Sequence, residues 1–181
     1  KIHDIVVLIQ GFIIYMLNSH SEVIEQSISV LSTLSDNEYS NVCQPLFNSS
    51  IGQHIRHVID HFENLQAGMS TQIVDYNNRS RNSKTESSIQ AALMQLHRIQ
   101  LWLKALTESD IQAQISVISE INVNQAQSVN VKSTVARELV FCASHAIHHY
   151  ALIKLIRQIQ GGVVDKHFGL APATITYQTS N

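Results

Sequence analysis

The sequence lacks an excess of basic residues. Its 12 lysines and arginines stand against 14 acidic residues, which gives a net charge of -2. A protein that binds nucleic acid through phosphate contacts needs a basic surface, so we predict no nucleic-acid partner. Charged residues of either sign make up only 14% of the chain, whereas hydrophobic residues make up 44%. This proportion excludes an intrinsically disordered chain and predicts a folded core.

Cysteine is also scarce, with two residues, Cys43 and Cys142, far apart in the sequence. No Cys-x-x-Cys spacing occurs, so the chain has neither the signature of a zinc ribbon nor that of a redox pair. The two residues could form one disulfide, but we favour two reduced thiols, which are typical of a cytoplasmic protein. We therefore predict a cytoplasmic localisation.

The apolar run at residues 5–17 is too short to cross a membrane. It has 13 residues, whereas a transmembrane helix needs about 20. It also lacks the basic run before it and the small-residue cleavage site after it that a signal peptide requires. We predict that these residues extend the first helix and that the protein has no membrane partner.

Apolar residues recur with helical spacing in four segments. The expected helices are residues 23–34, 49–68, 89–106 and 133–159. Serine or threonine at the start of the second and fourth segments suits an N-cap, and Gly161 with Gly162 ends the fourth. Four long helices predict an all-α fold, a four-helix bundle with its core at about residues 18–161. A chain of 181 residues suits one domain, residues 1–181.

The connecting segments differ in character. Residues 112–132 contain the β-prone stretches ISVIS and VNV, which predict a short β-hairpin inserted before the last helix. Residues 75–84 are polar and predict an exposed connection. Ser83 followed by Glu86 resembles a capping box. Residues 163–181, which include Pro172, are expected to form an extended C-terminal tail.

Histidine is abundant, with ten residues. Six of them lie in two clusters on the second and fourth expected helices, namely His54, His57, His61, His145, His148 and His149. Residues four apart share one helix face, so His145 and His149 can hold the same ion. A third imidazole from the facing helix would complete a site in the bundle core. Imidazole suits divalent zinc, nickel, iron or copper, and three ligands leave positions open.

The spacing alone does not choose the third ligand among His54, His57 and His61. Asp60 could orient a neighbouring imidazole by accepting its second N–H. His148 lies about 100° round the helix from His149 and is expected to point elsewhere. The alternative interpretation of both clusters is a hydrogen-bonded core or a pH-responsive group without metal.

The two motifs resemble those of the DinB-like superfamily, which includes the YfiT-type proteins. The resemblance covers about residues 18–161 and depends on His57-Val58-Ile59-Asp60 and on His145-Ala146-Ile147-His148-His149. It implies that His57, His145 and His149 are the metal ligands, with His54 and His61 as secondary candidates. It also implies an up-down-down-up bundle and a homodimer.

The resemblance also implies a chemistry. Characterised members include transferases that use low-molecular-weight thiols, a mycothiol-dependent isomerase and non-haem iron sulfoxide synthases. His54-Ile55-Arg56-His57 is similar to the His-Leu-Ala-His element of those synthases, but their catalytic partner domain is not found in this sequence, so we do not expect a complete synthase. The expected partner is a small-molecule substrate, which could be a low-molecular-weight thiol.

The functional hypothesis is an enzyme whose ion activates water or a thiol, for hydrolysis or thiol transfer. Glu138, seven residues before His145, is a candidate general base, although a surface role is equally compatible with its position. Asp75, Tyr76, Arg79 and Arg81 either surround the pocket mouth and hold an anionic substrate or form a solvated loop.

The competing hypothesis is a non-catalytic metal-binding or dimerisation module. A structural zinc site is normally closed by a fourth protein ligand. That ligand would have to be His54, His61, Glu138 or Cys142. For Cys142, however, the position predicts a small core residue.

Overall fold

A computed structural model gives the fold of residues 2–180, with the side chains of residue 11 and residues 13–180. The chain is mostly helical and has a small three-stranded sheet. Its elements are α1 (Ile2–Leu31), α2 (Asp36–Ser40), α3 (Ile51–Thr71), β1 (Ile73–Asp75), the 3-10 helix η1 (Lys84–Glu86), α4 (Ile89–Ala105), α5 (Glu108–Gln112), β2 (Gln114–Glu120), β3 (Ser128–Thr134), α6 (Val135–Ile159) and α7 (Pro172–Thr179).

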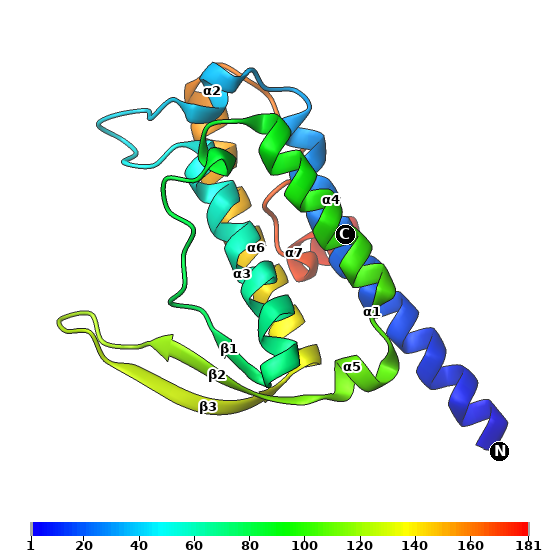
Figure 1. Cartoon of the computed structure of the whole chain (residues 1–181). Helices are drawn as coiled ribbons and strands as arrows, with labels where there is room; N and C mark the ends of the chain where they lie inside the picture. The colour runs from blue at the N-terminus through cyan, green and yellow to red at the C-terminus, as the bar shows by residue number, and fades with distance from the viewer. Residues whose placement is uncertain (1, 181) are drawn as a thin grey trace.

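The four long helices pack against one another. α3 contacts α6 and α4, and α1 contacts α4 and α6. Figure 1 shows α3 and α4 running in one direction and α1 and α6 in the other. The large apolar side chains between them are buried, among them Ile24, Leu31, Ile55, Phe62, Leu96, Ile99, Tyr150 and Ile153. Each such side chain contributes roughly 1.5–3 kcal/mol on burial, so this core fixes how α3 and α6 face each other.

Local signals define where the two histidine-bearing helices start. At the start of α3, Ser50 Oγ accepts the Gln53 N–H at 3.2 Å, and Gln53 Oε1 accepts the Ser50 N–H at 3.0 Å. At the start of α6, Thr134 Oγ1 accepts the Arg137 N–H at 3.2 Å. Gly161, with a φ of 78°, follows the end of α6. The predicted helices are confirmed, and α1 includes residues 5–17 as expected.

The predicted hairpin is present as β2 and β3, which pair antiparallel from Gln114 opposite Thr134 to Glu120 opposite Ser128. β1, which pairs parallel to β2, was not predicted. β1 follows α3 after one residue, and β3 leads directly into α6. The sheet therefore lies at the end of the α3–α6 pair (Figure 1) and anchors the C-terminus of α3 beside the N-terminus of α6.

Two local predictions are wrong. Residues 163–181 are not extended throughout, because Pro172 occupies the first turn of α7, where its fixed φ favours a helix. Ser83 makes no side-chain cap before η1, and Glu86 binds Arg56 instead. The residue that caps α4 is Ser88, whose Oγ accepts the Ala91 N–H at 3.3 Å.

By length and composition alone, α6 is apolar enough to cross a membrane. However, 44% of its most apolar window is buried inside the structure, and the helix packs against α3 and α1. Its apolar character follows from its position in the core.

Candidate metal centre

Three histidines meet where α3 faces α6. His57 comes from α3, and His145 and His149 come from successive turns of α6. His145 Nε2 lies 3.0 Å from His57 Nε2 and 3.1 Å from His149 Nε2. One ring nitrogen from each residue can be chosen so that all lie within 4.8 Å of one another. The structure thus brings together the three residues that the family resemblance singled out.

The spacing of these nitrogens suits a shared ion. Zinc–nitrogen bonds of about 2.0–2.1 Å place two nitrogens of one ion about 2.9–3.4 Å apart, depending on the coordination geometry. Hydrogen bonding alone satisfies the group poorly, because the single Nε2 of His145 faces two other Nε2 atoms and carries either a proton or one lone pair. A cation would accept all three lone pairs at once. The residues therefore fit a divalent metal ion.

The imidazoles are neutral at physiological pH. Burial, reinforced by neighbouring imidazoles and by Arg79, lowers the pKa of His57 to about 2. Burial is also the main cause that lowers the pKa of His145 to about 4 and that of His149 to about 3. A metal must bind the deprotonated ring, so the site needs no proton release at pH 7.

The other three histidines lie outside this group. His54 Nδ1 is 2.9 Å from His149 Nδ1, on the side of that ring away from His145. His61 Nδ1 contacts the His57 carbonyl at 2.9 Å, and the His61 ring stacks on Tyr76. His148 is exposed and outside the group, in agreement with the expectation that it points elsewhere. His54 and His61 are thus neighbours of the group and not members of it.

A pocket of about 370 Å³ opens beside the three histidines. Its lining residues are Ser49, Gln53, His54, Arg56, His57, Arg79, Arg81, Asn82, Glu86 and His149. Arg79 and Arg81 therefore do border the site, whereas Asp75 and Tyr76 do not. A larger cavity of about 870 Å³ lies between α1 and the segment 163–175, and it contains none of the six clustered histidines. We assign the site to the smaller pocket, because the metal-binding groups are there.

Comparison with known proteins identifies the family of this chain. The family model of the DinB superfamily matches residues 19–153, which is most of the chain. The chain belongs to the DinB superfamily. Its fold is similar to that of a crystallised DinB-like protein, YjoA of Bacillus subtilis, with a TM-score of 0.57 and 16% sequence identity. That alignment covers 86% of this chain and 97% of YjoA, and it supports the fold alone.

The DinB-superfamily chain also resembles part of a longer protein. It is 32% identical over 105 residues to "FK506-binding protein 5" of the fungus Rhizopus delemar. The match covers 58% of this chain but only 27% of the fungal protein. The chain therefore spans about a quarter of that relative.

In this DinB-superfamily chain, Glu138 belongs to a separate buried network. Tyr76 Oη donates to its Oε2 at 3.0 Å, and Ser133 Oγ donates to its Oε1 at 2.5 Å. Cys142 lies in the same network, 3.6 Å from Tyr76 Oη, and burial raises the pKa of its thiol to about 12. Neither side chain belongs to the three-histidine group. A base role for Glu138 stays a prediction, and Cys142 is buried as expected.

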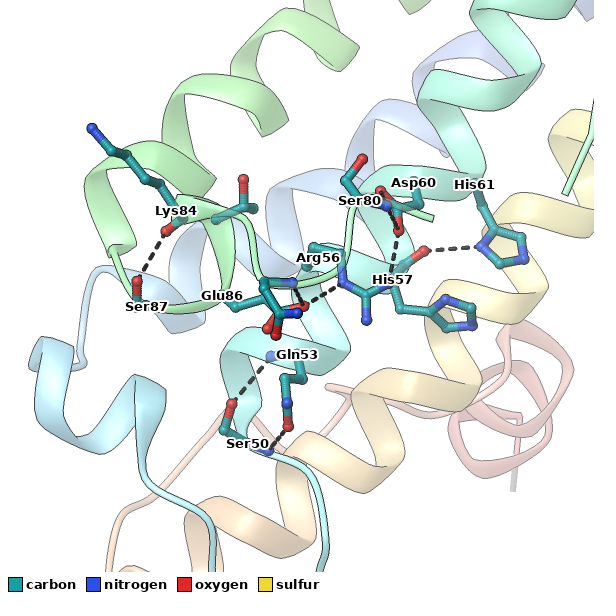
Figure 2. Close-up of polar contacts among 12 residues, drawn as sticks. Ser50, Gln53, Arg56, His57, Asp60, His61, Ser80, Lys84, Glu86 and Ser87 are labelled. Atoms are coloured by element: carbon teal, nitrogen blue, oxygen red, sulfur yellow. Dashed lines mark hydrogen bonds and ion pairs between the residues drawn. The ribbon is translucent and has the colours of Figure 1, made fainter. Parts of the chain in front are cut away.

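The expectation for Asp60 is wrong. Its carboxylate accepts Arg56 Nη1 at 2.7 Å and the Ser80 N–H at 3.2 Å, and it accepts no ring nitrogen of the described side chains. Arg56 Nε in turn donates to Glu86 at 2.9 Å, and Figure 2 shows this guanidinium lying between the two carboxylates. This role of Arg56 was not predicted, although its spacing of four from Asp60 is typical of a helical ion pair.

Proposed function

We propose that this chain is a divalent-metal-dependent enzyme that acts on a small-molecule substrate. His57, His145 and His149 would hold one zinc, nickel or iron ion. Such an ion lowers the pKa of a bound water or thiol, which provides a nucleophile at neutral pH for hydrolysis or thiol transfer. The proposal includes the four-helix, up-down-down-up bundle, the homodimer and the cytoplasmic location that the family resemblance and composition suggest.

One observation carries this proposal. Three neutral imidazole nitrogens converge beside a pocket that is lined by two of the same rings, His57 and His149. Among the described side chains, those of residues 11 and 13–180, no fourth His, Cys, Asp or Glu joins the three. A catalytic metal site keeps a coordination position open for water or substrate, whereas a structural zinc site is closed by a fourth protein ligand. The arrangement therefore favours an enzyme over a purely structural metal site.

Metal content of single variants tests the ligand set. Protein purified without chelator should contain about one transition-metal ion per chain. His57→Ala and His149→Ala should lose most of it, because each removes one of three ligands. His148→Ala is the matched control, since it removes an exposed histidine from the turn of α6 that carries His149. Metal-free parent protein, or loss of metal in the control alone, would contradict the proposal.

The reaction class is tested on cobalt-substituted protein. Low-molecular-weight thiols such as glutathione and bacillithiol should perturb the visible absorption of the cobalt if thiol transfer is the reaction. A spectrum that no thiol changes, together with turnover of ester or amide substrates, would favour hydrolysis. A spectrum that none of these thiols, esters or amides changes would favour the non-catalytic metal-binding or dimerisation module.

A further inference from the structure

We infer that the pocket beside the three histidines selects a substrate with an anionic group, which Arg79 and Arg81 bind while the reacting group lies at the metal. This inference rests on the proposed function and names its substrate class. Both arginines line the pocket together with His57 and His149. A guanidinium presents a planar set of donors that matches a carboxylate or a phosphate.

The third arginine of the pocket is already neutralised. Arg56 is buried and binds two carboxylates, Asp60 at 2.7 Å and Glu86 at 2.9 Å. Its charge is therefore used within the protein and is not available to a ligand. Glu86 is the single acidic residue of the pocket lining. Its Oε1 accepts the Asn82 N–H in addition to the Arg56 Nε–H.

Arg79 and Arg81 differ from Arg56 in this respect. Among the residues that the structure describes, neither of them forms an ion pair or a side-chain hydrogen bond. Arg79 is close enough to the histidines for its charge to contribute to the lowered pKa of His57 and of His145. Both side chains are exposed, so their guanidinium groups are available to an anion that enters the pocket.

The segment that carries the two arginines is held against α3 and η1. The Ser80 N–H donates to Asp60 (Figure 2). The Asn82 N–H donates to Glu86, so the Arg56 ion pairs and this segment share the same carboxylates. The backbone of residues 80 and 82 is thus fixed on either side of Arg81. Preorganisation of this kind reduces the entropy lost when a side chain binds its ligand. The pocket combines a metal-binding side with a cationic side.

The test compares two small thiols on cobalt-substituted protein. 3-Mercaptopropionate carries a carboxylate, whereas 2-mercaptoethanol carries a neutral hydroxyl. Titration of the cobalt absorption should give about tenfold tighter binding of 3-mercaptopropionate, in the range of one charge-assisted contact. Arg79→Gln/Arg81→Gln should abolish this preference, because it removes the partners of the carboxylate.

The matched control is Arg98→Gln/Lys104→Gln, which removes the same charge from the exposed surface of α4 outside this pocket. It should keep the preference for 3-mercaptopropionate. Equal affinity of the parent for both thiols, or a preference that survives in Arg79→Gln/Arg81→Gln, would overturn the inference.

A metal-free arm separates this inference from the proposed function. Malonate titrated into the metal-free protein should shift the NMR amide signals of Ser80 and Asn82, and Arg79→Gln/Arg81→Gln should remove the shift. A chain that takes up no cobalt yet shows this malonate response contradicts the metal proposal and supports the anion site. Amide signals that malonate does not move overturn the anion site, whether or not cobalt binds.

Discussion

At the scale of single residues, the contact between His54 and His149 limits which nitrogens carry protons. His149 presents Nε2 to His145 and Nδ1 to His54. If Nε2 binds a metal, the proton of the neutral ring is on Nδ1, and His54 Nδ1 must accept it. His54 would then carry its own proton on Nε2, an atom that is buried without a hydrogen-bond partner in the described structure. With a metal bound, His54 would therefore position the ligand His149.

Replacing His54 tests this role. His54→Phe keeps a ring of similar size but removes the acceptor, so metal affinity should fall by about 10–100-fold, as it does when a partner of a metal ligand is lost. The metal content at saturation should remain one ion per chain. Competition with a chromogenic chelator measures the affinity. His148→Phe is the control, and equal affinities of the two variants would show that His54 does not orient His149.

The residue scale also shows what the sequence could and could not predict of the site. The spacing of four between His145 and His149 placed both on one helix face, and the structure agrees. Which of His54, His57 and His61 faces α6 depends on how α3 is rotated about its axis, and the spacing does not specify this rotation. The choice of His57 therefore required the family motif. The contact of Asp60 with the Ser80 N–H was missed because it depends on a loop twenty residues away.

At the scale of elements, Gly52 determines how closely α3 approaches η1. A Cβ at this position would lie 2.0 Å from the Glu86 carbonyl oxygen and 2.9 Å from Tyr39 Cε1. The carbonyl belongs to the backbone and has little room to move, so η1 and α3 would have to separate. Because Glu86 also binds Arg56, this contact links the packing of η1 to the pocket.

We expect Gly52→Ala to destabilise the protein by about 1–3 kcal/mol, the usual cost of overpacking. Gly11→Ala is the matched control, since a Cβ there meets nothing within 4 Å. In the interior of α1 this second change should instead stabilise the protein by up to about 1 kcal/mol through helix propensity. Urea unfolding measures both free energies. A Gly52→Ala variant as stable as Gly11→Ala would mean that η1 does not pack on α3 at this distance.

The helices and strands that were predicted correctly are those whose sequence signals are local. α3 and α6 begin at cap residues that bond to their own first turn, so the sequence alone located them. β1 has three residues and exists through its pairing with β2, forty residues further along the chain. No local pattern specifies such a partner. The short α7 was missed for a different reason, because Pro172 was interpreted as a signal for extended chain and not as the start of a helix.

At the scale of the whole molecule, the proposed site joins two helices that are far apart in the sequence. Its ligands come from α3 and from α6, and they are brought together only when these helices pack. An ion that binds the folded chain but not the unfolded chain stabilises the fold by RT ln(1 + [L]/Kd). Metal binding should therefore raise the thermal stability of the protein by an amount that depends on the metal affinity.

Thermal unfolding with increasing zinc tests this coupling. At free zinc about 100-fold above Kd, the gain is about 2.7 kcal/mol, which raises Tm by roughly 5–10 °C in a chain of this size. His145→Ala removes the ligand whose Nε2 lies between the other two, so its Tm should not respond to zinc, while His148→Ala should respond as the parent does. A parent Tm that zinc leaves unchanged would mean that α3 and α6 are not joined by an ion, and the histidines would then be core residues without a metal. A rise that persists in His145→Ala would place the ion elsewhere in the molecule, because two remaining imidazoles hold zinc far more weakly than three.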